Sequence, residues 1–184
     1  MGTKFSTCVW VSVVGIASIF FGSKGYADTV ISVADFGLKP DTRENAVAYV
    51  QKAIEACRGK EPVTLVFPEG RYDFWPQYAH EKNYYETNTY DVFPKRLAML
   101  FEGLHNITVD GSGSQFIMHD RIQPITVENC DGVTLKNFSI DWDIPLTAQA
   151  RVTKVGSDFF EIEINVLESP YIIEDGKLVF VGEG

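Results

Sequence analysis

The sequence predicts an all-β fold in which short strands form the coils of a parallel solenoid, with one helix near its start. Runs of β-branched and aromatic residues alternate with turn residues along most of the chain. The segment from His105 to Gly111 resembles the segment that starts 26 positions later at Asp131, since both contain a turn, an apolar-Thr-apolar strand and a second turn. Short strands that recur every 20 to 30 residues, roughly, are typical of a solenoid. An antiparallel sandwich of short strands would not require the repeat and stays as the alternative.

Composition sets the broad class of the protein. The chain has 184 residues, of which 45% are hydrophobic, enough for one domain with a real core and too many for a disordered tail. The formal net charge of −9 provides no basic surface for nucleic acid or for an anionic membrane. Aromatic residues make up 13% of the chain, which suits either a regular core or a surface that stacks on a ligand.

Residues 1–27 have the pattern of a secretory signal peptide. Lys4 precedes an apolar run over residues 8–22, and small residues end the segment at Ala27. The run is shorter than the roughly 20 residues that span a bilayer, so an uncleaved anchor is the less favoured alternative. We expect cleavage between Ala27 and Asp28 and a secreted or periplasmic protein. Cleavage removes two lysines and no acidic residue, so the net charge changes from −9 to −11.

The cysteine and histidine residues predict no metal site and no cofactor. Cys57 and Cys130 remain after cleavage, and we expect two separate buried thiols in preference to a disulfide. His80, His105 and His119 are scattered and have no zinc-ligand spacing.

The first elements alternate strand, helix and strand. Residues 31–33 predict a short strand, and the turn that follows leads to an amphipathic helix ending near Cys57 and capped by Asp41 or Thr42. The single apolar face predicts that this helix packs against another part of the protein. Residues 63–67 and 71–74 predict two strands around a Pro-Glu-Gly turn.

The rest of the chain begins with a long irregular excursion, because residues 76–96 lose periodicity. Short strands follow at residues 99–101, 107–109, 116–118, 125–127, 133–135 and 138–140. After Pro145 come two hairpin patterns, at residues 150–164 and at residues 171–180. About two solenoid coils without a terminating cap would hardly be stable alone, so we expect the N-terminal part of a longer protein.

Two segments resemble a known fold family. Residues 33–37 (VADFG), the helix after them and residues 66–72 (VFPEGRY) are similar to the opening of pectin-lyase-like proteins, which are right-handed parallel β-helices. In that fold the first helix caps the open end of the solenoid, which protects unpaired strand edges.

A closer resemblance covers most of residues 30–184. Residues 67–76 (FPEGRYDFWP), the stretch with Tyr84, Tyr85 and Asn88, and residues 137–145 (NFSIDWDIP) are similar to the α-1,3-galactosidases of glycoside hydrolase family 110. The resemblance implies a β-helix with an inserted β-rich domain, and an enzyme that removes terminal α-1,3-linked galactose with inversion. It also implies three regions, namely the signal peptide at 1–27, the helical cap and first coils at 28–148, and the start of the inserted antiparallel β domain at 149–184. Asp120 departs from the family pattern, where a glycine would follow the histidine.

An inverting glycosidase uses two carboxyl groups roughly 6.5–9.5 Å apart. Asp141 and Asp143 are the local candidates, since residues i and i+2 of one strand point the same way. The alternative is that both residues shape the exit before Pro145, where Asp often caps or turns. The resemblance implies that the essential carboxylates lie in later coils, beyond Gly184.

A stronger set of candidates concerns substrate contact. His119, Arg121, Asp141 and Trp142 fall near one coil, and indole and guanidinium groups suit a sugar. Alternatively, His119 bonds a turn and Trp142 packs under the hairpins.

We therefore expect the N-terminal part of a secreted, exo-acting, inverting α-1,3-galactosidase, inactive as this segment alone. A galactose-terminated glycan is the expected partner. We expect no nucleic acid partner, and no membrane after signal cleavage, while assembly into a homo-oligomer stays open. The alternatives are a non-catalytic carbohydrate-binding or adhesion β-helix and a polysaccharide lyase, although the charge of −11 gives little attraction for an acidic polymer.

Overall fold

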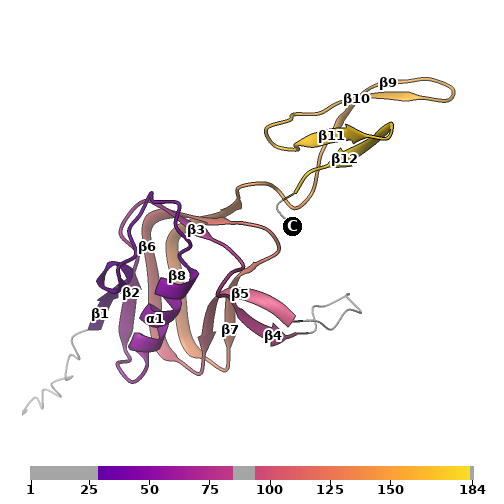
Figure 1. Ribbon diagram of the computed structural model, residues 1–184. Coiled ribbons are helices and arrows are strands. Elements are labelled where there is room, and N and C mark those ends of the chain that lie inside the picture. Colours follow the sequence, from indigo (N-terminus) through magenta and orange to yellow (C-terminus); the bar gives the residue numbers. More distant parts are fainter. Residues whose placement is uncertain (1–28, 85–93, 183–184) are drawn as a thin grey trace, which may run out of the picture.

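Strands make up most of the regular structure in a computed structural model, which describes residues 29–84 and 94–182 (Figure 1). The helices are η1 (Val33–Phe36) and α1 (Val47–Cys57). The strands are β1 (Thr29–Ser32), β2 (Val63–Val66), β3 (Arg71–Phe74), β4 (His80–Asn83), β5 (Pro94–Glu102), β6 (His105–Met118), β7 (Gln123–Glu128), β8 (Asp131–Trp142), β9 (Arg151–Val155), β10 (Phe160–Glu163), β11 (Tyr171–Glu174) and β12 (Lys177–Phe180). The mostly β fold is as the sequence predicts.

The largest sheet is entirely parallel. Its strand order is β1-β2-β6-β3, and β8 pairs with β6 along the length of both strands. His105 is opposite Asp131, so the 26-residue repeat seen in the sequence is the register of this pair. Parallel pairing of consecutive repeats differs from the antiparallel pairing of the sandwich alternative.

A second sheet combines one antiparallel and one parallel pair. β5 runs parallel to β7, with Leu97 opposite Gln123, and β4 runs antiparallel to β5. The prediction that residues 76–96 form no packed element is therefore wrong for β4 and for the start of β5. The sequence His-Glu-Lys-Asn of β4 has no apolar alternation, and its pairing with β5 alone makes it a strand. Tyr85 and Asn88, which contribute to the family resemblance, lie outside the described residues.

Helix α1 has the predicted apolar face but a different start. Val50, Ala53 and Ile54 are buried, and the helix contacts β1, β2 and β5. The predicted caps are wrong, because the helix begins at Val47, whose N–H donates to the side-chain oxygen of Asn45. Asp41 instead accepts a hydrogen bond from the N–H of Arg71, so it fixes the chain before β3.

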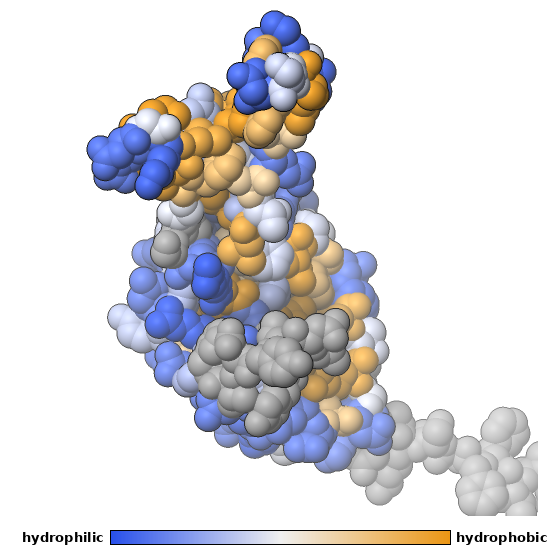
Figure 2. All heavy atoms as spheres, turned by 90° about the vertical axis from the view of Figure 1, so that its right-hand side faces the viewer, coloured by the Kyte–Doolittle hydropathy of each residue, from blue (hydrophilic) through white to orange (hydrophobic). Residues whose placement is uncertain are grey.

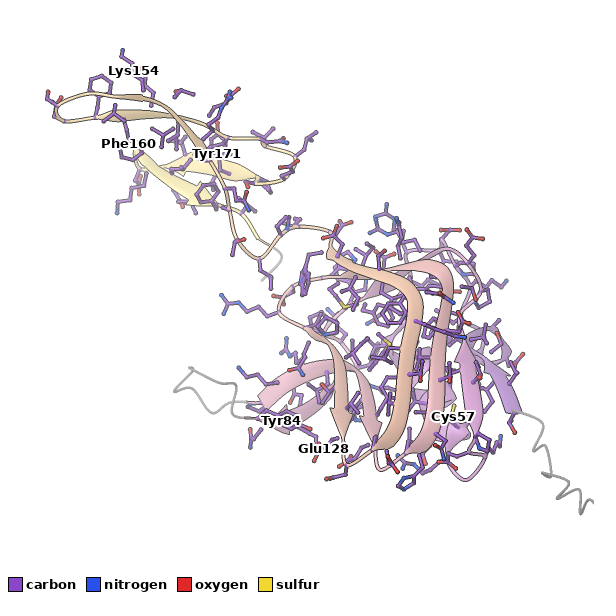
Figure 3. The ribbon with its side chains drawn as sticks, turned by 180° about the vertical axis from the view of Figure 1, so that it is seen from behind. Cys57, Tyr84, Glu128, Lys154, Phe160 and Tyr171 are labelled. Carbon is purple, nitrogen blue, oxygen red and sulfur yellow. The ribbon has the colours of Figure 1, made fainter. Side chains whose placement is uncertain are left out.

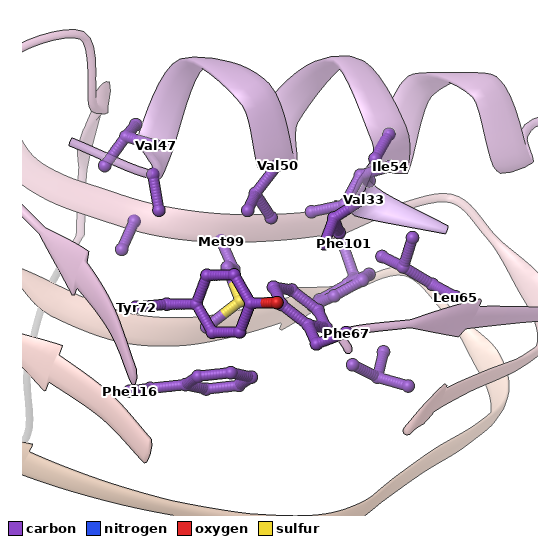
Figure 4. Close-up of a cluster of buried hydrophobic side chains, with 14 of the residues drawn as sticks. Val33, Val47, Val50, Ile54, Leu65, Phe67, Tyr72, Met99, Phe101 and Phe116 are labelled. Carbon is purple, nitrogen blue, oxygen red and sulfur yellow. The ribbon is translucent and has the colours of Figure 1, made fainter. Parts of the chain in front are cut away.

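The core lies between α1 and the sheets and is rich in aromatic rings (Figure 4). The ring of Phe116 lies 4.7 Å from the ring of Phe67, 5.6 Å from Phe74 and 4.7 Å from Phe138, measured between centroids. Phe74, Phe116 and Phe138 come from β3, β6 and β8, and Phe67 directly follows β2, so these rings join successive repeats. The sequence left open whether the aromatic residues fill the core or stack on a ligand, and these rings fill the core, because alternation in each strand turns one residue in two toward it.

Two antiparallel hairpins, β9/β10 and β11/β12, confirm the patterns found after Pro145. They extend away from the sheets, and apolar residues gather on them in the surface view (Figures 1 and 2). The exposed apolar side chains of this region include Val155, Phe160, Leu167, Ile173 and Phe180. The division of the chain at residues 148 and 149 stays a prediction.

Both cysteines in the described part are free, as the sequence analysis expected. Cys57 is fully buried as expected, whereas the expectation of a buried thiol is wrong for Cys130, which is half-buried. Within the described ranges, no helix is long and apolar enough to cross a membrane. The signal segment and its cleavage site at Ala27 and Asp28 lie outside those ranges.

Candidate functional site

A polar edge forms where β3, β6 and β8 end. The parallel ladder continues one residue past these strands, because the N–H of His119 donates to the carbonyl of Phe74 at 3.0 Å and the N–H of Asp143 donates to that of Met118 at 3.1 Å. Residues 75, 119 and 143 are therefore neighbours in successive repeats. Side chains two residues apart in a strand share a face, so Arg71 and Asp73 lie on this face too. We call Arg71, Asp73, His119 and Asp143 the polar edge.

Asp73 is the centre of the polar edge. Its side chain is 0% exposed and accepts hydrogen bonds from Arg71 Nε at 3.0 Å and from Arg71 Nη2 at 2.6 Å. His119 Nε2 lies 2.8 Å from Asp73 Oδ1. Burial alone would raise the pKa of Asp73, but the hydrogen bonds from Arg71 and His119 outweigh it and hold the pKa below its usual value. Asp73 is thus a buried carboxylate that is ionised at neutral pH.

Arg71 connects this buried carboxylate to the exit of β8. Its Nη2 donates to Asp143 Oδ1 at 2.6 Å, and Arg43 Nη1 lies 3.5 Å from the same oxygen. The hydrogen bond to Asp73 is the main cause that raises the pKa of Arg71 above its ordinary value, and the bond to Asp143 adds to it. Asp143 is therefore already engaged by two guanidinium groups, so it is better placed to organise this edge than to activate water.

His119 is held from two sides. Besides its contact with Asp73, its ring stacks on the indole of Trp75, with centroids 3.5 Å apart and planes within 6° of parallel. The residue is only 2% exposed. Asp73 belongs to β3, so this contact is not the bond to a turn raised as the alternative for His119, and the assignment of His119 as a substrate contact stays a prediction.

Asp141 and Trp142 lie beside the polar edge on β8. Asp141 is exposed, and its Oδ1 accepts the N–H of Trp142 at 2.8 Å. Trp142 is half-buried, packs against the core and donates from Nε1 to the carbonyl of Asp120 at 3.3 Å. The exposed carboxylate of Asp141 is therefore open to a sugar hydroxyl.

Arg121 lies in a different place, in a cavity of about 890 Å³. The cavity is bounded by β4, by the start of β5, by the start of β7 and by the segment after β8. Its lining residues are Glu81, Pro94, Lys95, Arg96, Arg121, Ile122, Gln123 and Leu146. The four residues predicted to touch substrate are thus divided between this cavity and the polar edge.

A second charged cluster lies on the other sheet. Lys82 Nζ lies 2.7 Å from Glu102 and 2.8 Å from Glu128, which are neighbours in the parallel pair of β5 and β7. The hydroxyl of Tyr84 also donates to Glu128, and both residues are labelled in Figure 3. The hydrogen bond from Lys82, followed by that from Tyr84, lowers the pKa of Glu128. Lys82 neutralises two adjacent acids that would otherwise repel each other, which is a structural role.

Comparison with known proteins finds relatives that share one name, alpha-1,3-galactosidase. It is 61% identical over 158 residues to alpha-1,3-galactosidase B of Bacteroides thetaiotaomicron, covering 86% of this chain and 26% of that protein. This chain is a relative of the alpha-1,3-galactosidases. It is also 37% identical over 155 residues to alpha-1,3-galactosidase A of Shewanella woodyi, covering 84% of this chain and 25% of that protein.

A third alpha-1,3-galactosidase, form B of Phocaeicola vulgatus, is 36% identical over 185 residues and is matched by 98% of this chain. No protein-family model matches the chain. The chain spans about a quarter of the length of the alpha-1,3-galactosidases that it matches.

Arg71 and Asp73, which the polar edge contains, were not among the candidate residues found in the sequence. The alternation in Arg71-Tyr72-Asp73-Phe74 was a usable signal, because buried Tyr72 and Phe74 place the two charged residues together on the opposite face. Among the described residues, no group of three or more His, Cys, Asp or Glu side chains is arranged to hold a metal ion.

Proposed function

We propose that this chain is one part of a longer alpha-1,3-galactosidase, an exo-acting glycoside hydrolase that removes terminal α-linked galactose from glycans. The observation that carries the proposal is the 61% identity over 158 residues to a protein of that name. The chain covers only a quarter of such relatives, so the remaining length supplies the rest of the enzyme.

The proposed fold is that of glycoside hydrolase family 110, a right-handed parallel β-helix of the pectin-lyase-like type. Its support is the chain of parallel partners from Ile31 through Leu65 and Val109 to Leu135, which stacks equivalent positions of successive repeats. In this proposal α1 caps the first coil. β8, whose Leu135 and Ile140 are exposed, pairs with a following coil, and residues 149–184 begin an inserted β domain.

Within this enzyme the polar edge forms part of the wall of the sugar site. Asp141 offers an open carboxylate to the sugar, while Arg71 and Asp73 fix the exit of β8 from behind. The indole of Trp142 packs against the core on the other face of β8. Asp143 is engaged by two arginines, so the acid and base of an inverting mechanism come from elsewhere in the longer protein.

The proposed protein is exported. Residues 1–27 would direct it to the periplasm or the exterior, with cleavage between Ala27 and Asp28. Its partners would be galactose-terminated glycans.

The test is hydrolysis of galactosyl disaccharides by the full-length protein. We expect galactose release from an α-1,3-linked disaccharide and little from α-1,4- or α-1,6-linked ones. Residues 28–184 alone serve as the control and should release none. Galactose release by residues 28–184 alone would favour Asp141 and Asp143 as the catalytic pair. No release by the full-length protein from any disaccharide would refute the proposal and favour a carbohydrate-binding β-helix.

A further inference from the structure

A cavity of about 370 Å³ lies beside the first half of α1. Its volume is at the lower end of the range found for small-molecule sites. All of its lining residues belong to the described part of the chain, and none of them is a residue of the polar edge. The lining residues are Glu44, Asn45, Ala48, Tyr49, Lys52 and Tyr78.

Tyr78 has an unusual backbone conformation for its side chain. It is the third residue of a turn that the N–H of Ala79 closes on the carbonyl of Pro76 at 3.1 Å, and its φ is 68°. Glycine or asparagine normally occupies a turn position with positive φ, and a bulky side chain there is strained. Tyr78 is 74% exposed, so burial of its ring does not offset this cost. Strain that the local packing does not repay is typical of residues kept for a function.

Two amide side chains fix the turn that carries Tyr78. Asn45 Nδ2 donates to the carbonyl of Gln77 at 2.9 Å, and Gln51 Nε2 donates to the carbonyl of Tyr78 at 2.8 Å. Gln51 belongs to α1 and Asn45 lies just before it, so the turn is tied to this helix. A ring on a fixed backbone has less freedom to lose on binding, which favours a ligand at this place.

The other lining residues offer a second ring and both kinds of hydrogen-bonding group. Tyr49 is half-buried and packs against the core, which holds its ring in place. Glu44 and Lys52 are exposed, and within the described ranges neither forms an ion pair. A carboxylate accepts hydrogen bonds and an ammonium group donates them. Their charges balance, so the cavity favours a neutral ligand that carries several hydroxyl groups.

We propose that this cavity binds a neutral sugar unit of a glycan. The ring of Tyr78 stacks on the C–H face of the sugar, while Glu44 and Lys52 bond to its hydroxyl groups. The inference goes beyond the proposed function, because it assigns a glycan-binding site that does no hydrolysis. Tyr78 keeps its strained conformation because its ring is needed at the mouth of the cavity.

The test follows the tyrosine rings directly. The full-length protein is prepared with 3-fluorotyrosine and observed by fluorine NMR, and Tyr49→Phe and Tyr78→Phe identify the two signals by removing them. The probe is lactose, a neutral disaccharide whose β linkage an α-galactosidase does not cleave. We expect lactose to shift both signals with one dissociation constant on the order of 1 mM. The signal of Tyr171, an exposed tyrosine of β11, should not move.

Substitutions at Tyr78 separate the role of its ring from the strain. Tyr78→Ala should raise the dissociation constant, read from the Tyr49 signal, about tenfold, whereas Tyr78→Trp should keep the affinity because an indole also stacks. Tyr78→Gly should weaken binding as Tyr78→Ala does, yet it should unfold at a higher urea concentration than the native protein, because glycine adopts this φ without strain. Tyr171→Ala is the matched control and should leave binding unchanged.

An absence of any lactose-induced shift at Tyr49 and Tyr78 would overturn the inference. Equal shifts with sorbitol, an open-chain polyol, would also overturn it, because no ring face would then be recognised. Lactose binding that is lost in Asp141→Asn and kept in Tyr78→Ala would place the sugar at the polar edge instead. If lactose binds through Tyr78 but the protein hydrolyses no galactosyl disaccharide, the inference survives and the proposed function fails.

Discussion

Arg71 reaches across two repeats to Asp143, 72 positions later in the chain, and donates a hydrogen bond of 2.6 Å to its carboxylate. The same guanidinium binds the buried Asp73. One side chain therefore fixes both the edge of β3 and the point where the chain leaves β8 for the hairpins. The point where the chain leaves β8 is therefore held by an ion pair between residues far apart in the sequence, in addition to the backbone pairing of β8.

Replacing Arg71 tests this connection. Arg71→Gln leaves Asp73 buried with fewer donors, and removal of one partner of a buried ion pair costs roughly 3 kcal/mol. We expect urea denaturation to show a loss of that size. Arg151→Gln also breaks an arginine–carboxylate pair, with Glu163, but both partners are exposed, so its cost should stay below about 1 kcal/mol. Similar losses for the two variants would contradict the role of Arg71.

The lowered pKa of Asp73 predicts acid sensitivity. A carboxylate with a lowered folded-state pKa stabilises the fold fully above its unfolded pKa, and this contribution is lost as pH falls below about 4. Asp73→Asn should lower the free energy of unfolding at pH 7 and should reduce its dependence on pH below 4. Parallel stability curves for the native protein and Asp73→Asn across this range would argue against an ionised Asp73.

The two cysteines should differ in reactivity. Burial raises the pKa of the Cys57 thiol to about 11, and its Sγ donates to the carbonyl of Ala53. Cys130 is half-buried. Because the thiolate is the reactive form, an alkylating reagent should modify Cys130 first and Cys57 only on unfolding. Peptide mass spectrometry after timed labelling measures both, and fast modification of Cys57 in the folded protein would contradict its burial.

Phe116 should be the most costly aromatic residue to truncate, since it contacts rings from several repeats. Phe116→Ala should cost about 3–5 kcal/mol by loss of buried area and formation of a cavity. Phe160→Ala on the exposed face of β10 is the control, with a change within about 0.5 kcal/mol. If both substitutions had the same effect, the rings around Phe116 would not form the centre of the core.

The features that the sequence predicted correctly depend on local patterns. The strands of the parallel sheet, the 26-residue register and both hairpins follow from alternation and turn residues within a few positions. The start of α1 was missed because Asn45 is fixed by distant groups, donating to the carbonyl of Gln77 at 2.9 Å while it accepts from Val47. β4 was missed because a polar strand has no pattern of its own.

The candidate site also contains residues that the sequence predicted and contacts that it did not predict. His119, Asp141 and Trp142 were found because they follow or end predicted strands. The partnership of Asp73 with His119, 46 positions later, depends on which repeats stack, and the sequence predicted the stacking without the contact. The separation of Arg121 from the other three arises because the chain turns at Asp120, which has a positive φ of 53°.

The longer protein is proposed to hydrolyse terminal α-1,3-linked galactose with inversion. Proton NMR of the full-length protein acting on an α-1,3-galactosyl disaccharide, read before the released sugar mutarotates, tests this directly. We expect β-galactose as the first product. First appearance of α-galactose would contradict inversion, and an intact disaccharide would contradict the assignment of this chain to an alpha-1,3-galactosidase.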